Sequence, residues 1–251
     1  MLSTIDWGFV VAAILATTVV GLAKGGLSGL GILGMPILAL AVEPVEAAAI
    51  LLPLLIVQDV VGVWSFRHDC DWHIVKVMIP GAAVGVLSGW AFVTVVPVSA
   101  VMAVLGLISI FFGLWRLWIE RGGRVVAAAR SPDWVGTLFG VGLGFTSQVA
   151  HAGGPPFQFW VMPKQLPHTR FIGTSTMTFA IVNWMKVPAY LALGQFSRHD
   201  LTLSAALLPV AILSTLAGIW AVRRIRGRTF YTIVNLLMVM LGLKLLIDGL
   251  F

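Results

Sequence analysis

Charged residues are scarce in this chain, and their scarcity excludes most classes of soluble protein. Only 10% of the 251 residues are Asp, Glu, Lys or Arg, and 59% are hydrophobic, whereas an ordinary soluble domain has about a quarter charged residues. A soluble protein of this length needs a polar surface around its core. The few charges here form short clusters between long apolar runs. We therefore expect an all-α, polytopic integral membrane protein of the cell inner (plasma) membrane.

Other absences narrow the function. Cys70 is the single cysteine, which excludes an internal disulfide. No Lys or Arg precedes Lys24, so the first apolar run lacks the basic flank of a cleaved signal peptide, and we expect it to stay in the protein. The sequence has no His-Glu-x-x-His pattern and no Gly-x-Ser-x-Gly elbow, so we expect no enzyme. We also expect no metal and no cofactor, and without an ATP-binding motif the energy source must be a gradient or a partner.

The apolar runs predict about ten membrane segments. A spanning helix needs about 20 apolar residues, and a broken or re-entrant segment needs fewer. The runs at 27–42 and 153–163 are short and rich in Gly or Pro, and each either crosses the membrane or re-enters it. The predicted segments are 7–22, 27–42, 45–66, 74–93, 97–116, 134–149, 153–163, 171–193, 201–222 and 229–250.

Two arginine clusters predict the orientation. Lys and Arg accumulate in cytoplasmic loops, and ten segments place both clusters on one side. We therefore expect loops 117–132 and 223–228 in the cytoplasm and both termini outside it. The net charge of +6 then reflects topology and not a nucleic-acid partner; a lipid or partner site is the alternative. The clusters are Arg116, Arg121, Arg124 and Arg130, and Arg223, Arg224, Arg226 and Arg228.

The two halves of the chain resemble each other. Residues 21–36, GLAKGGLSGLGILGMP, align without gaps on residues 140–155, GVGLGFTSQVAHAGGP, with matching Gly, Ser and Pro positions. Five segments in each half is an odd number, so the second half is expected to lie upside down relative to the first, as in many secondary transporters. We expect a first repeat at 1–118, a basic cytoplasmic linker at 119–132 and an inverted second repeat at 133–251.

Glycine and proline interrupt the helices at equivalent places, Gly25-Gly26 with Gly29 in the first half and residues 151–156 in the second. In hydrocarbon every backbone N–H and C=O needs a partner, so such breaks occur where they face protein or a wet cavity. Each break is predicted to aim backbone N–H groups and a helix N-terminus at an anion. The alternative is that these glycines only allow close helix packing, as in Gly21-x-x-x-Gly25 and Gly81-x-x-x-Gly85.

These patterns resemble the TauE/SafE sulfite exporter family, also called the toluene sulfonate uptake permease family. The resemblance covers nearly the whole chain and rests on the opening GLAKGGLSGLGILGMP, the GGPP break and the stretch RFIGTSTMTFAIVNWMKVPAYLALG at 170–194. It implies transmembrane movement of sulfite, sulfonates or related organosulfur anions.

Four ionisable residues stand out because they lie deep in predicted segments or at the helix breaks, namely Lys24, Asp59, His151 and Lys186. A charge near the bilayer centre costs about 2.5 to 3.5 kcal/mol on insertion scales, so each of these residues is expected to have a structural or functional role. One interpretation is that the two lysines hold an anion while nearby hydroxyl and amide groups replace its water shell. The other is that Lys186 and Asp59 neutralise each other and Lys24 snorkels to an interface.

The predicted substrate-binding set collects polar groups and break glycines. Asp59 and His151 are the candidates for proton coupling, since histidine ordinarily titrates near physiological pH, although a buried histidine can also serve as a neutral hydrogen bonder. The set is Lys24, Gly25, Gly26, Ser28, Thr146, Ser147, Gln148, His151, Gly153, Gly154, Asn183 and Lys186, and Gln58, Thr174, Ser175 and Thr178 are further candidates for the cavity wall.

The sequence thus favours a secondary transporter, and more specifically an exporter, for a small sulfur-containing anion such as sulfite or an organosulfonate. It would work by alternating access around a mid-membrane site. An anion channel is the alternative. The expected partners are the substrate, the lipid bilayer and, for coupling, protons.

Overall fold

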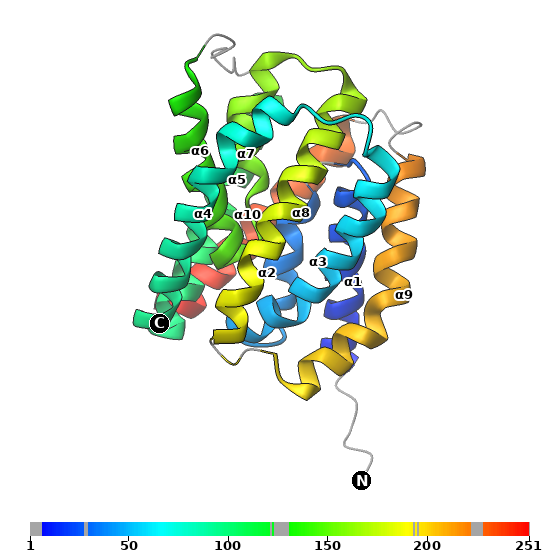
Figure 1. The fold of residues 1–251 in the computed structure, drawn as a ribbon. Coiled ribbons are helices and arrows are strands. Elements are labelled where there is room, and N and C mark those ends of the chain that lie inside the picture. Colours follow the sequence, from blue (N-terminus) through cyan, green and yellow to red (C-terminus); the bar gives the residue numbers. More distant parts are fainter. Residues whose placement is uncertain are drawn as a thin grey trace.

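The computed structural model describes residues 7–27, 30–120, 122, 131–192, 194, 196–221 and 228–250, with side chains except at 116, 120, 228–235, 237 and 238. Within these ranges the chain forms ten α-helices and two short 3₁₀ helices, and no strand (Figure 1). The all-α prediction is therefore confirmed.

The predicted segments correspond closely to the helices. The runs 45–66, 74–93 and 201–222 match α3, α4 and α9 to within three residues at each end. The elements are α1 (Trp7–Lys24), η1 (Leu30–Leu33), α2 (Gly34–Leu38), α3 (Pro44–Phe66), α4 (Trp72–Val95), α5 (Val98–Glu120), α6 (Asp133–Ala150), α7 (Gly154–Val161), η2 (Met162–Lys164), α8 (His168–Ala192), α9 (Arg198–Ala221) and α10 (Arg228–Leu250).

Five of the described helices, α1, α3, α4, α5 and α9, are long and apolar enough to cross a membrane. α8 is long enough, at 25 residues, but it carries polar side chains such as Thr178, Asn183 and Lys186. These three are buried inside the bundle, so their polarity does not face the surroundings of the protein. The long apolar helices make the chain an integral membrane protein, and the number of ten segments stays a prediction.

The helices run between two ends of one bundle (Figure 1). At the end we call the Arg67 end, α3, α5 and α9 finish and α4, α6, α8 and α10 begin. At the opposite end, called the Glu43 end, α1, α3, α5 and α9 begin and α4, α8 and α10 finish. The helices that flank both arginine-rich segments therefore meet at the same end, as the predicted orientation requires.

The first short segment forms one arm of a hairpin. Gly26 adopts a φ of 121°, a conformation that favours glycine, and η1 and α2 then run back beside α1. An added Cβ on Gly31 would lie 3.1 Å from the Cβ of Ala23, and one on Gly34 would lie 2.2 Å from a methyl of Val20. The chain therefore returns toward the Glu43 end, where α3 begins.

α6 and α7 form the second hairpin, which enters from the Arg67 end. His151 caps α6 in the left-handed conformation, with a φ of 50°, and Gly154 starts α7. An added Cβ on Gly136 would lie 2.4 Å from the Trp160 ring, so the two arms are in close contact. The described parts of the two hairpin tips, at 25–27 and 151–153, thus approach the middle of the bundle from opposite ends.

The helix contacts repeat when the two halves are exchanged. α1 packs against α9 as α6 packs against α4, and α3 packs against α9 as α8 packs against α4. In this exchange α1 corresponds to α6, α3 to α8, α4 to α9 and α5 to α10. The remaining large contacts, α3 with α8 and α5 with α10, are each between two corresponding helices and so stay the same. An inverted duplication predicts this pattern, and the repeat boundaries at 118 and 133 remain predictions.

Glycines allow the paired helices to touch through their backbones. An added Cβ on Gly25, directly after α1, would lie 2.5 Å from the carbonyl oxygen of Thr215 on α9, and one on Gly144 of α6 would lie 2.1 Å from the carbonyl oxygen of Ala82 on α4. The packing interpretation of the glycine patterns is therefore right at these positions. Gly25 packs against α9 and does not line the central cavity, contrary to its predicted place in the binding set.

We expect Gly144→Ala to lower the thermal stability of the purified protein clearly, because the added methyl meets the backbone of α4 and overpacking costs about 1–3 kcal/mol. Gly142→Ala on the same helix is the matched control, since its nearest contact would be an ordinary 3.7 Å from Pro156. Thermal unfolding in detergent compares them. Equal melting temperatures for the two variants would contradict the backbone contact.

Candidate functional site

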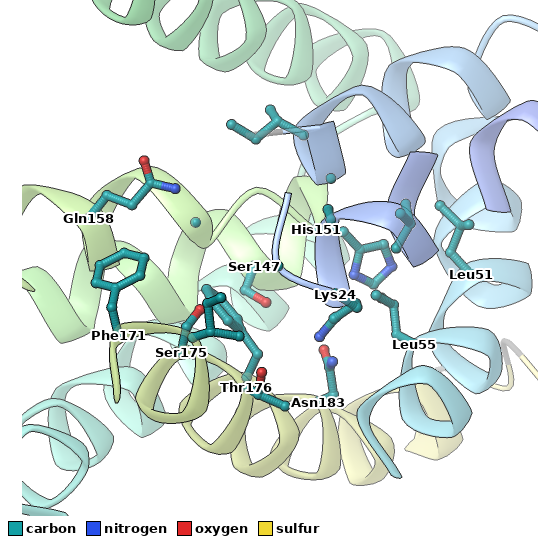
Figure 2. Close-up of a pocket in the computed structure, with 18 residues that line it drawn as sticks. Lys24, Leu51, Leu55, Ser147, His151, Gln158, Phe171, Ser175, Thr176 and Asn183 are labelled. Atoms are coloured by element: carbon teal, nitrogen blue, oxygen red, sulfur yellow. The ribbon is translucent and has the colours of Figure 1, made fainter. Parts of the chain in front are cut away.

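A cavity of about 100 Å³ lies in the middle of the bundle, where the hairpin tips meet α3 and α8. Lys24, Ser147, His151 and Asn183 are four of its seven polar lining residues, and in Figure 2 the Lys24 and Asn183 side chains point toward one another beside the other two. The wall extends past Phe171, near the start of α8, toward the Arg67 end. Most of the remaining wall is apolar and includes Val20, Ala23, Leu51, Leu55, Ile172 and Phe179.

Lys24 forms an ion pair with Asp59 at the edge of this cavity. Lys24 is the last residue of α1, where the helix dipole favours a cation. Its ammonium contacts Asp59 Oδ1, and Asn183 Nδ2 donates to Oδ2 of the same carboxylate. The Asp59 side chain is only 3% exposed, so these two donors compensate for its lost hydration. The expectation that Lys24 snorkels to an interface is wrong, because it pairs inside the bundle.

Lys186 is fully buried behind the cavity wall and makes a different set of contacts. Its Nζ lies 2.8 Å from His151 Nδ1 and donates to the Ser147 carbonyl oxygen at 3.3 Å. His151 Nε2 lies 3.2 Å from the Ala48 carbonyl oxygen, which can only accept. His151 Nε2 therefore carries the proton and Nδ1 accepts from Lys186. The predicted neutralisation of Asp59 by Lys186 is wrong, because the Asp59 oxygens are bound by Lys24 and Asn183.

The cluster contains two lysines and one carboxylate. Asp59 is the one carboxylate that pairs with either lysine among the residues that the structure describes. Lys186 is bound only by neutral acceptors, a ring nitrogen and a carbonyl. With both lysines protonated, one positive charge remains without a counterion. Because a buried charge is costly without a partner, this site suits a monovalent anion.

The structure brings together about half of the predicted binding set. Lys24, Gly26, Ser147, His151, Gly154 and Asn183 line the cavity, and Lys186 lies directly behind it. Thr146 does not line it and donates instead to the Gly142 carbonyl oxygen of its own helix. Gln148 lies beside a separate small void, and Ser28 falls outside the described residues. Gly153 packs against Phe179 and Leu143.

Of the further wall candidates, Ser175 lines the cavity. Thr174 and Thr178 donate to carbonyl oxygens of α8 itself, and Gln58 donates to the Thr17 carbonyl oxygen. Hydroxyl groups in membrane helices often bond their own backbone in this way. A hydroxyl residue in a membrane helix is therefore not, by its type alone, evidence for a cavity-lining position.

Among the residues that the structure describes, the hairpin tips offer fewer free amides than the sequence predicts. The first turn of α7 contains Pro155 and Pro156, which have no N–H, and Phe157 N donates to Gly153 O. This leaves the Gly154 N–H, on the cavity wall, as the free donor of the first turn. α2 follows η1 directly, so it has no separate N-terminus. The two lysine side chains are therefore the main cationic groups of the site.

Sequence reasoning missed several wall residues. Gln158 on α7 and Phe171, Thr176 and Phe179 on α8 line the cavity. Phe179 also lies under the Lys24 ammonium, 5.3 Å from Nζ to the ring centroid. Their helical spacing from Asn183 could have identified the α8 residues, since 172, 175–176, 179 and 183 lie on one face of a helix.

These features define a helical membrane protein with buried ionisable groups around a central cavity, a construction typical of membrane transporters. The family model described as Sulfite exporter TauE/SafE matches residues 13–245, nearly the whole chain. The chain therefore belongs to the TauE/SafE sulfite exporter family, a family of membrane transporters, and the resemblance noted from the sequence is confirmed. No curated protein and no solved structure matches the chain significantly.

Proposed function

We propose that this protein is a secondary transporter that exports a small sulfur-containing monoanion, either hydrogensulfite or an organosulfonate, by alternating access. The observation that carries the proposal is the buried cluster of two lysines and one carboxylate beside the cavity. An anion with one negative charge would balance the cluster. Lys24, with Ser147, His151 and Asn183, would contact the anion, and Lys186 would act on it from behind His151.

The shape of the cavity supports an organic substituent on the anion. Lys24, Ser147, His151 and Asn183 form one polar part of the wall, and apolar side chains such as Leu51, Leu55 and Phe179 form much of the rest. Hydrogensulfite needs only the polar part, whereas a sulfonate places its charged group there and its carbon chain along the apolar wall. Burial of that chain is favourable by about 0.8 kcal/mol for each CH₂ group.

The orientation of the cavity supports export. The wall reaches toward the Arg67 end, and the positive-inside rule assigns that end to the cytoplasm. The described conformation would then load substrate from the inside. His151, Lys186 and Tyr190 close the other side, which favours a carrier over the alternative, an anion channel, because a channel needs a continuous path. Asp59 and His151 remain the proposed proton-coupling residues.

Flux into proteoliposomes tests the proposal. We expect saturable uptake of labelled sulfite, competition by short organosulfonates, exchange against internal substrate, and a rate that changes with an imposed pH gradient. Conductance without saturation or exchange would establish a channel instead. The absence of flux for both sulfite and sulfonates would overturn the proposed substrate class.

A further inference from the structure

A second, much smaller void lies on the Glu43 side of the central cavity. It has a volume of about 10 Å³ and is lined by residues near the Glu43 ends of their helices, among them Val45, Ala48, Val101, Gln148 and Tyr190. This volume is close to the minimum that holds one water molecule. The Gln148 side-chain oxygen is buried and accepts no hydrogen bond from the described residues. A buried polar atom without a partner is unusual, and a water molecule in this void would satisfy it.

A single layer of side chains separates this void from the central cavity. His151 lines the cavity, whereas Tyr190, whose ring stacks on His151, lines the void. Their ring centroids are 6.5 Å apart, with an interplanar angle of 26°. Ala48, whose carbonyl oxygen accepts the hydrogen bond from His151 Nε2, also lines the void. The layer therefore joins α3, the tip of the α6–α7 hairpin and the last turns of α8.

Lys186 hydrogen-bonds to His151 in this layer. Its ammonium hydrogen-bonds His151 Nδ1 at 2.8 Å, which fixes the tautomer and so keeps Nε2 as a donor to Ala48. Among the described residues, the ammonium contacts two neutral acceptors, His151 Nδ1 and the Ser147 carbonyl oxygen. A charged acceptor forms a stronger hydrogen bond than a neutral one, so an anion in the cavity competes for Lys186 against His151.

We propose that Lys186, His151 and Tyr190 form the closed gate of the transport path, and that an anion bound in the cavity opens it by drawing Lys186 away from His151. His151 then loses the contact that orients its ring toward Ala48 and stacks it on Tyr190. The void at Gln148 expands into the half of the path that leads to the Glu43 end. This role of the three residues rests on the proposed transport function. Lys186 would both bind the anion and, in its absence, stabilise the closed gate through His151.

Cysteine accessibility tests the gate without any transport measurement. In a Cys70→Ser background, Val101→Cys places one thiol at the void, since Val101 lines it and is 3% exposed. Val98→Cys is the matched control on the same helix and at the same end, where Val98 is 39% exposed. Both are reacted in nanodiscs with a positively charged methanethiosulfonate, so that the orientation of the protein does not matter.

We expect Tyr190→Ala and, separately, His151→Gln to raise the labelling rate at position 101 by about tenfold, the factor that each 1.4 kcal/mol of lost closed-state stability produces. Tyr190→Phe keeps the ring and should label as slowly as the parent. Methanesulfonate, which does not react with thiols, should accelerate labelling in the parent and not in a Lys186→Gln variant. The rate at position 98 should stay constant throughout, which also shows that each variant is folded.

Equal labelling at position 101 in the parent, Tyr190→Ala and His151→Gln would overturn the gate, even if the protein transports sulfite normally. Labelling that rises in these variants in a protein without sulfite or sulfonate flux would support the gate and reject the proposed substrate. If Tyr190→Ala opens position 101 but methanesulfonate has no effect on the parent, the anion-driven opening is wrong.

Discussion

Replacing Lys186 with Gln should lower the affinity for the transported anion by about two orders of magnitude or abolish transport, since removing one partner of a buried charged contact costs about 2–5 kcal/mol. The side chain is fully buried, and its charge has no carboxylate counterion of its own within the described part of the chain. Gln is one bond shorter than Lys but keeps a neutral hydrogen-bond donor on an unbranched side chain. The charge is therefore the main property that changes.

Uptake of labelled sulfite by proteoliposomes measures the effect, with protein amount and orientation matched. Lys244→Gln is the control for the same substitution outside the site, because Lys244 is 58% exposed and pairs with Asp248 one helical turn away. We expect Lys244→Gln to transport like the parent protein. Unchanged sulfite uptake by Lys186→Gln would remove Lys186 from the anion site and would weaken the charge argument for a monoanion.

Much of the fold could be predicted from the sequence because hydrocarbon imposes simple rules. Long apolar runs located α3, α4 and α9 to within three residues. The positions of the breaks followed from the same physics, since Gly26 and His151-Ala152-Gly153 interrupt helices where backbone groups can be bonded by protein. The direction in which the chain leaves each break was left open, because either a crossing or a hairpin fits a short apolar run.

Side-chain partners were harder to predict because they depend on how the hairpins fold. Lys24 and Asp59 are 35 residues apart, and their contact requires α1 to end beside α3 at that depth. The same limit applies to Ser147 and Gln148, which are adjacent in sequence but line two different cavities. Successive residues on a helix point about 100° apart. Residue type alone therefore cannot tell which of the two faces the anion site.

Asp59→Asn should be the most destabilising single substitution in the site. It removes the carboxylate and leaves Lys24 as a second uncompensated cation in a buried cluster, and breaking a buried ion pair from one side costs about 3–5 kcal/mol. For a protein of this size, that cost corresponds to a fall of about 10 °C in melting temperature. Thermal unfolding of the purified protein measures it, with Asp248→Asn as the exposed control.

The double variant Lys24→Gln with Asp59→Asn separates stability from function. Removing both charges leaves no unpaired ion at this position, and replacing a whole buried pair is often nearly neutral, so the melting temperature should return close to that of the parent. Transport should stay below about a tenth of the parent rate, since removing a cation that binds the anion at the cavity wall costs more than the 1.4 kcal/mol that a tenfold change requires. A double variant that is stable and transports at the parent rate would assign Lys24 a purely structural role and leave Lys186 as the cation that recognises the substrate.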